Sequence, residues 1–252
     1  MPVPLVLDLY HGDVVTSWDT IHDSGIRGVI HKASQGSSIV DKKYADRKPQ
    51  AQRAGLLWGA YHFGDGSDVD AQVNNFLSVV GDAKDTLLAL DFEPNPKGAS
   101  MSLSQAKYFL QKIEEKTGQI PALYSGHFIK EQLKDATGLF WGKYKLWLCQ
   151  YANTPVLPAA WDKYWLWQYT GDGVGPKPHS IAGIQGDVDL NVFNGSEAEL
   201  KMSWLTYGSP QVVSVESSKD LPWIEIAKGL VGIEETPGSK NNTTIISWAK
   251  VL

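Results

Sequence analysis

Short apolar runs alternate with amphipathic stretches along the first half of the chain, and this alternation constrains the fold most. Apolar runs bounded by turn residues indicate buried strands, whereas a period near 3.6 residues indicates helices. The sequence predicts strands over residues 5–9, 28–33, 56–63, 86–92 and 120–125. It predicts helices between them and after the last of them, over residues 18–24, 43–54, 69–79, 104–117 and 127–136.

The alternation changes in the second half of the chain. Three more strands are predicted over residues 145–151, 164–170 and 186–193, but their connections are short and rich in Pro and Gly. The segments PVLPAA and GDGVGPKP leave little room for a packed helix. The predicted fold is therefore α/β, a TIM-like (β/α)5β3 barrel with eight strands, five regular helices and a short C-terminal helical tail.

Acidic residues recur on one face of three predicted strands. Side chains alternate along a strand, so Asp91 and Glu93 fall on the face opposite the apolar side chains of residues 86–92. The same alternation places Asp8 and Asp189 on the interior face of their strands. We expect these carboxylates at or near the C-terminal strand ends, where barrels of this type hold their catalytic groups.

Asp91 and Glu93 are the most informative pair. Two residues apart on one strand, they lie roughly 6.5–7 Å apart at a rise of about 3.3 Å per residue. Two such carboxylates inside a partly apolar barrel do not both ionise easily, so one retains a proton at a raised pKa. Glycoside hydrolysis uses this arrangement: one carboxylic acid donates a proton, and a second carboxylate stabilises or attacks the anomeric centre.

Aromatic residues are abundant, with 10 Trp and 10 Tyr in 252 residues. Such side chains fill cores, but they also stack on the apolar faces of sugar rings. Tyr61, Tyr124, Trp147 and Trp167 all fall on predicted strands. If they face the interior, they line the same barrel end as the acids, although a Trp on a barrel strand also fits a core layer. Acids walled by aromatics indicate a polysaccharide cleft.

Other chemistries find less support in the sequence. Asp8, His11, His31 and His62 could together hold a divalent ion, but no His-x-His pair or helical His pair accompanies them. We therefore predict no metal and no cofactor. The single cysteine, Cys149, lies on an apolar strand and is predicted to be a core residue. A non-enzymatic glycan-binding barrel and a metal-dependent hydrolase stay open as alternatives.

Charge and hydropathy limit the partners. The chain has 23 Lys and Arg against 28 Asp and Glu, a net charge of −5, and no basic run that would attract nucleic acid. It has no apolar stretch of the length that spans a bilayer and no basic, apolar start typical of a signal peptide. We expect a monomer that is made in the cytoplasm without a signal peptide, does not insert into membranes and does not bind nucleic acid.

Several motifs, taken in order, resemble glycoside hydrolase family 25, the lysozymes of bacteria, fungi and phages. The motifs are VLDLYHG, VIHKASQG, AGLLWGAYHFG, LALDFEPN, LYSG, LWLCQYA, WLWQYT and VDLNVFNG, spread over residues 3–203. The resemblance implies a (β/α)5β3 barrel. It also implies cleavage of the β-1,4 bond between N-acetylmuramic acid and N-acetylglucosamine in peptidoglycan, with retention of configuration.

The resemblance also implies roles for the four acids. Glu93 matches the general acid/base of the family. Asp91 matches the carboxylate that orients the 2-acetamido group of the substrate, which itself attacks the anomeric carbon; a direct nucleophilic role for Asp91 is the alternative. Asp8 and Asp189 match the remaining active-site acids.

The candidate substrate-binding residues are Tyr10, Tyr61, His62, Tyr124, Trp147 and Trp167. Two positions depart from the family pattern. Tyr10 and His11 replace the more common Ser-His-Trp/Tyr pattern, and Gln35 stands where Glu is frequent. The details of sugar binding are therefore expected to differ from those of other members.

The chain divides unevenly. The sequence predicts a catalytic barrel over residues 1–203, a linker over 204–220 and a helical segment over 221–252. The last segment resembles the start of NlpC-type peptidase modules but lacks their catalytic Cys and His. It is predicted to be a truncated second module, a docking tail or a small wall-binding element. The expected protein is a phage endolysin-like muramidase that acts on the cell wall after release, during host cell lysis.

Overall fold

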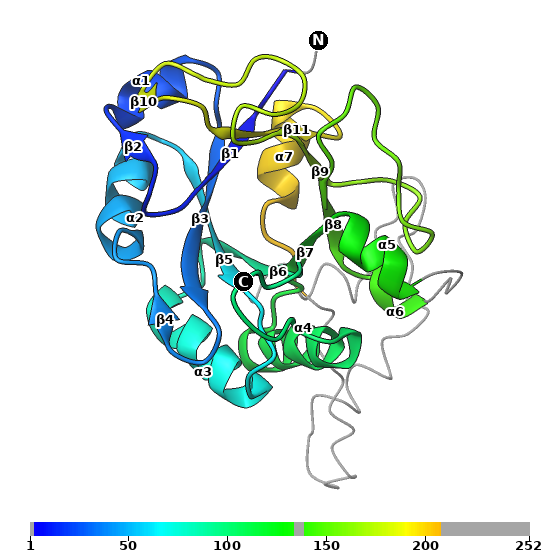
Figure 1. The fold of residues 1–252 in the computed structure, drawn as a ribbon. Helices are drawn as coiled ribbons and strands as arrows, with labels where there is room; N and C mark the ends of the chain where they lie inside the picture. The colour runs from blue at the N-terminus through cyan, green and yellow to red at the C-terminus, as the bar shows by residue number, and fades with distance from the viewer. Residues whose placement is uncertain (1–2, 134–138, 208–252) are drawn as a thin grey trace, which may run out of the picture. The chain divides into compact units, whose positions relative to one another are not determined.

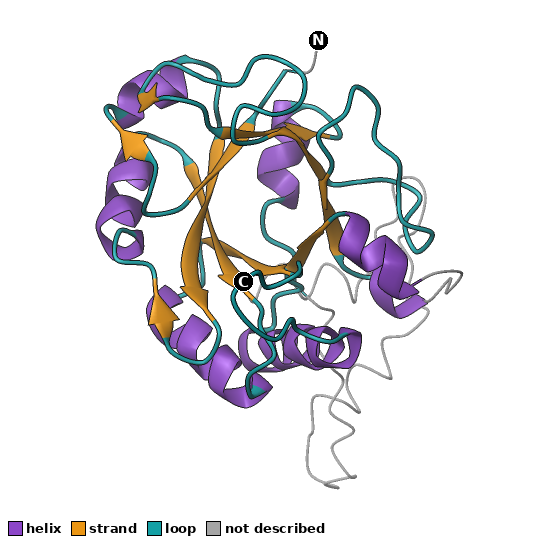
Figure 2. Ribbon diagram, viewed as in Figure 1, coloured by secondary structure: helices purple, strands orange, loops and turns teal. Residues whose placement is uncertain are grey.

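A closed barrel of eight strands forms the centre of the molecule (Figure 2). The computed structural model describes residues 3–133 and 139–207, which belong to one compact unit. Around the barrel the strands are β1 (Val6–Leu9), β3 (Gly28–Gln35), β5 (Leu57–Phe63), β6 (Thr86–Asp91), β7 (Ala122–Ser125), β8 (Lys145–Cys149), β9 (Leu166–Thr170) and β11 (Asp189–Phe193). The pairing of β1 with both β3 and β11 closes the ring. The predicted α/β barrel is confirmed.

Five helices cover the first half of the barrel, as predicted (Figure 1). They are α1 (Trp18–Asp23), α2 (Tyr44–Arg53), α3 (Val69–Val80), α4 (Leu103–Thr117) and α5 (His127–Leu133). The predicted end of the fifth helix, residues 134–136, lies outside the described residues. Helix α4 shows why the boundaries were readable: Ser102 and Gln105 form a capping box, and Gly118 ends the helix in a left-handed conformation.

Some short elements were not predicted. They are β2 (Val14–Val15), β4 (Ile39–Val40), β10 (Ile184–Gln185), α6 (Leu139–Gly142) and α7 (Glu197–Ser203). Helix α7 carried a readable signal, because Ser196 and Glu199 form a capping box at its start. None of the helices within residues 3–133 and 139–207 is long and apolar enough to cross a membrane.

Helix α7 and the residue after it close one end of the barrel. Leu200 and Trp204 are buried in the cluster that fills the barrel interior, and the Trp204 indole donates to the carbonyl of Trp58 at 2.8 Å. A side chain at Gly28 would begin 2.7 Å from the Trp204 ring, so glycine is required there. The packed part therefore extends beyond residue 203. Residues 208–220 of the predicted linker and the segment 221–252 lie outside the described residues.

Strand β11 corrects one prediction. It runs antiparallel to both of its neighbours, β1 and β9. Asp189 is therefore the first residue of its strand, and the expectation that it lies near a C-terminal strand end was wrong. Because the strand is reversed, its start still meets the C-terminal ends of the parallel strands, and Asp189 pairs with Asp8. We call this end of the barrel the mouth.

The predicted side-chain faces are confirmed. Leu88, Leu90 and Phe92 belong to the apolar layer between barrel and helices, whereas Ala89 belongs to the interior cluster. One irregularity alters the alternation: β3 has a bulge, because Lys32 pairs with Tyr61 and Ser34 with the next residue of β5, His62. A bulge inserts one extra residue and re-aims those that follow it.

Candidate active site

Four carboxylates meet at the mouth of the barrel. Asp91 ends β6, Glu93 follows two residues later, Asp8 lies on β1 and Asp189 begins β11. Asp91 is only 6% exposed and Asp8 only 8%, whereas Glu93 is half-buried. The structure therefore brings together the four acids singled out by the sequence.

The acids hold protons more tightly than usual. Burial raises the pKa of Asp91 well above its ordinary value, and the neighbouring Glu93 raises it further. Burial also raises the pKa of Glu93, and a hydrogen bond from the Cys149 thiol partly offsets this. The pKa of Asp189 rises to about 7, mainly through burial and then through the charge of Asp172. The site can therefore store a proton near neutral pH.

An amide network supports Asp8 inside the barrel. The Gln168 side-chain nitrogen donates to both Asp8 oxygens at 3.0 and 3.1 Å and to Asp189 at 3.2 Å. Asn191 donates to Asp8 at 2.8 Å. The Tyr124 hydroxyl in turn donates to Gln168 at 2.6 Å. Because N–H donors stabilise a carboxylate, this network opposes the effect of burial on Asp8 and fixes its position.

Aromatic side chains stand beside the acids. Tyr61 faces the interior, and both burial and the charge of Asp91 raise the pKa of its hydroxyl. Tyr124 lies deeper and is 8% exposed. Tyr10, in the loop after β1, is 47% exposed. These three residues form an aromatic wall that rises from the barrel interior to the surface.

A family model for glycosyl hydrolases family 25 matches residues 7–177. The chain belongs to this family. Lysozyme M1 of Streptomyces globisporus is 26% identical over 215 residues, which cover 77% of this chain and 69% of that protein. This membership makes the chain a glycoside hydrolase of the lysozyme type.

Solved structures agree. A bacterial lysozyme from Streptomyces coelicolor has a TM-score of 0.67 and 27% identity, covering 77% of this chain and 93% of that one. A family 25 lysozyme from Aspergillus fumigatus has a TM-score of 0.65 and 26% identity, covering 79% of this chain and 97% of that one. The TIM-like barrel is thus shared with family 25 lysozymes.

Three of the predicted substrate-binding residues lie elsewhere in this family 25 barrel. Trp147 is 1% exposed within the barrel, where its indole donates to Asn191. Trp167 is 5% exposed, packs outward against Tyr169 and donates to the carbonyl of Gln150. Each therefore packs in a core layer and is not a sugar platform. Trp167 is the immediate neighbour of Gln168, which faces inward, so alternation turns Trp167 to the other side.

His62 is the third correction. It is fully buried on the outer side of β5, where it stacks on Phe109 with ring centroids 5.0 Å apart. Its ring nitrogens hydrogen-bond to Ser34 at 2.8 Å and to Gln72 at 3.1 Å. Tyr61 and His62 are consecutive on a strand, so only one of them can face the interior. Tyr61 is the residue that does.

The candidate metal residues are not brought together. His31, like His62, lies on the outer side of the sheet, and it stacks on Trp58. Asp8 faces the interior, and His11 pairs with Asp41. Within residues 3–133 and 139–207, no group of three or more His, Cys, Asp or Glu side chains could hold a metal ion.

Sequence reasoning missed several residues of the site. Gln168, Asn191 and Lys32 all face the interior, and the signal for the first two was a polar residue within an apolar strand. Cys149 was predicted to lie in the core. It is instead half-buried at the end of β8, beside Glu93. Its place on the same face as Trp147, at the C-terminal strand end, could have indicated this.

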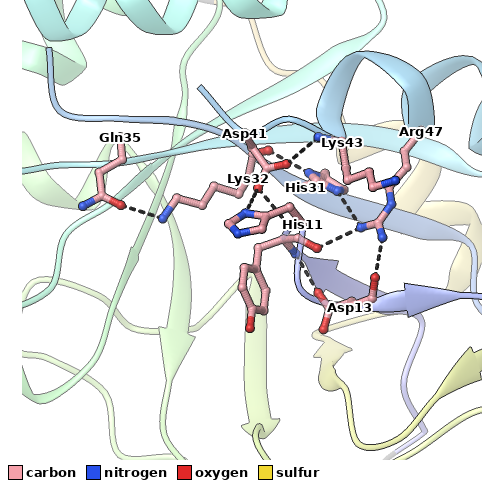
Figure 3. Close-up of polar contacts among 9 residues, drawn as sticks. His11, Asp13, His31, Lys32, Gln35, Asp41, Lys43 and Arg47 are labelled. Carbon is pink, nitrogen blue, oxygen red and sulfur yellow. Dashed lines mark hydrogen bonds and ion pairs between the residues drawn. The ribbon is translucent and has the colours of Figure 1, made fainter. Parts of the chain in front are cut away.

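A buried arginine holds the loop that carries Tyr10 (Figure 3). Arg47 of α2 is 7% exposed and donates to the carbonyls of Tyr10, at 2.8 Å, and of Asp13. It also donates to His31, whose pKa burial lowers to about 4, so that this ring is neutral and accepts the bond at 3.0 Å. Asp41 holds the same loop by accepting from the backbone nitrogen and ring of His11.

Replacing Arg47 with Met should loosen this loop. Each lost bond from the charged group to a carbonyl costs about 1.5–3 kcal/mol of stability. We expect KM for soluble peptidoglycan fragments to rise by about tenfold, equivalent to about 1.4 kcal/mol of binding. The value of kcat should change much less, because Tyr10 lies away from Asp91 and Glu93. Steady-state kinetics measure both effects, with the exposed Lys42→Met as control for charge loss. An unchanged KM would contradict the role of Arg47.

Proposed function

We propose that this chain is an N-acetylmuramidase that hydrolyses the β-1,4 bond between N-acetylmuramic acid and N-acetylglucosamine in peptidoglycan. The observation that carries the proposal is the placement of Asp91 and Glu93. They lie together at the mouth of a family 25 barrel, with raised pKa values and an aromatic wall beside them. A protonated carboxyl group next to a second carboxyl group is what glycosidic bond cleavage requires.

Glu93 is the proposed general acid and base. It is more exposed than Asp91, so it can reach an oxygen of a sugar chain that crosses the mouth. Its raised pKa keeps it protonated near neutral pH, and in the first step it donates that proton to the leaving oxygen. In the second step the Glu93 carboxylate removes a proton from the incoming water. This exchange of roles is typical of retaining enzymes.

Asp91 is the proposed partner at the anomeric carbon. Its Oδ1 atom is buried and makes no hydrogen bond to any described residue, so it is available to the substrate. In one route this oxygen accepts a hydrogen bond from the 2-acetamido N–H, and the acetamido oxygen attacks the anomeric carbon. In the other route Asp91 itself attacks. Both routes require Asp91 to be ionised.

The remaining groups bind and stabilise the sugar. Asp8 and Asp189, linked by Gln168, supply negative charge across the mouth, which favours the positive charge that develops at the anomeric centre. Tyr10 and Tyr61 offer ring faces and hydroxyl groups to the sugars. The proposed biological role is bacterial cell lysis, with the enzyme acting on the wall after release.

Mass spectrometry of digested peptidoglycan tests the proposal. We expect glycan fragments that end in N-acetylmuramic acid at the reducing end, and no newly freed peptides. Borohydride reduction before digestion of the fragments identifies the terminal sugar. Fragments ending in N-acetylglucosamine would indicate a glucosaminidase. Freed stem peptides with intact glycan would indicate an amidase or peptidase, and either result would overturn the proposal.

A further inference from the structure

Lys32 is brought to the mouth by the bulge in β3. Residues 32 and 35 of a regular strand face opposite sides, but the extra residue between Lys32 and Ser34 returns Gln35 to the interior face. The Lys32 ammonium group donates to the Gln35 side-chain oxygen at 2.7 Å (Figure 3). It also lies 5.1 Å from the centre of the Phe63 ring. The side chain is thus held in place at both its polar and its apolar contacts.

This position is next to Asp91. Gln35 pairs with Phe63 across β3 and β5, and Phe63 pairs with Asp91 across β5 and β6. The three residues form one row across the mouth, and the Lys32 ammonium group lies over the middle of that row. Because Gln35 is neutral, its hydrogen bond leaves the charge of Lys32 uncompensated. The attraction between Lys32 and Asp91 lowers the pKa of Asp91.

We infer that Lys32 is a positioning residue for Asp91, whose positive charge keeps this carboxylate ionised while Glu93 keeps the shared proton. The inference deepens the proposed function and rests on its assignment of roles to the two carboxyl groups. It also gives the departure at position 35 a meaning. A Glu there would compensate Lys32 directly, whereas Gln35 directs the charge to Asp91.

The surroundings of Asp91 explain why a cation is needed. Glu93 and Asp8 both raise the pKa of Asp91, and Lys32 is the charge that opposes them. The other titratable groups near Asp91 are Tyr61, Tyr124 and Cys149. Lys32 itself is attracted by Asp91 and Asp41 and repelled by Lys97. Without Lys32 the proton moves to the more buried carboxyl, Asp91, and both catalytic roles are lost together.

The pH dependence of kcat/KM tests this assignment. An ionised Asp91 sets the acidic limb of the profile, so a higher pKa of Asp91 moves that limb to higher pH. We expect Lys32→Met to move the limb upward by about one pH unit, with a loss of about tenfold on the acidic side that shrinks as pH rises. Lys32→Arg should restore the wild-type limb. An equal loss at every pH, with the limb unmoved, would overturn the inference.

Two further variants act through position 35. Gln35→Glu supplies a negative partner to Lys32 and should move the acidic limb in the same direction, whereas Gln35→Met removes the hydrogen bond without adding charge and should move it less. If Lys32→Met does not fold in a thermal unfolding experiment, Gln35→Glu still decides. An unmoved limb in that variant would contradict the inference.

An NMR titration separates this inference from the proposed function. The carboxyl carbon of Asp91, observed in ¹³C-labelled protein, should titrate at higher pH in Lys32→Met than in the wild type or in Lys32→Arg. This measurement does not depend on activity. If the wild type releases no reducing ends, the proposed function fails. If the Asp91 titration is the same in all three proteins, the role of Lys32 fails.

Discussion

Replacing Glu93 with Gln is expected to reduce kcat for peptidoglycan by about 10²–10⁴-fold, the contribution typical of a positioned general acid. The amide has the shape of the carboxyl group but cannot give up a proton to the leaving oxygen. The fold should persist, because Glu93 is half-buried and forms no ion pair within the described residues. Removing the charge also removes its repulsion of Asp91.

Release of reducing ends from purified peptidoglycan measures this effect, and thermal unfolding verifies that the variant is folded. The matched control is Glu115→Gln, which removes an exposed carboxylate from α4 and should leave the rate unchanged. If the Glu93 variant clears peptidoglycan as fast as the wild type, Glu93 is not the general acid, and the proposed mechanism is wrong.

Replacing Trp147 with Ala is expected to lower the free energy of unfolding by about 3–5 kcal/mol, the cost of removing a large side chain from a packed core. Trp147 packs edge-on against Tyr124 and Tyr61, with ring centroids 4.5 and 6.2 Å away. Its indole also holds Asn191, which in turn donates to Asp8. Loss of the ring therefore weakens the barrel core and the support of Asp8 at once.

Chemical denaturation followed by fluorescence measures the loss, and Tyr10→Ala supplies the comparison. Tyr10 is largely exposed, so its truncation should change stability by about 0.5 kcal/mol or less while weakening substrate binding. The pair distinguishes a core residue from a sugar platform. A Trp147→Ala protein of wild-type stability that binds peptidoglycan poorly would restore Trp147 to the substrate-binding set.

Local patterns were sufficient for much of this fold. The apolar runs of residues 86–92 and 145–151 are short and bounded by turns, so their strands were visible in the sequence. The alternation that separates Ala89 from Leu88 and Leu90 also placed Asp91 on the interior face. A capping box and a terminal glycine marked the ends of α4. Each of these features depends on residues close together in the chain.

The remaining features depend on contacts between distant residues. The sequence of β11 does not indicate its direction, because an antiparallel strand shows the same alternation as a parallel one. The bulge in β3 is visible only in its pairing with β5. Arg47 reaches Tyr10 across 37 residues, and no local pattern marks it. His62 and Trp167 are different, because alternation alone argued against them once Tyr61 and the interior acids were assigned.

The reversed last strand has a consequence for the order in which this enzyme assembles. Asp8 is held by Gln168 from 160 residues away and by Asn191 from 183 residues away. Such distant pairings form late, because the entropy of closing a long loop must be overcome before the contact gives any return. Closing the ring and completing the acid cluster are therefore the same event. A chain folded only through β8 holds Asp91 and Glu93 on a partial sheet, with Asp8 still lacking both of its amide donors.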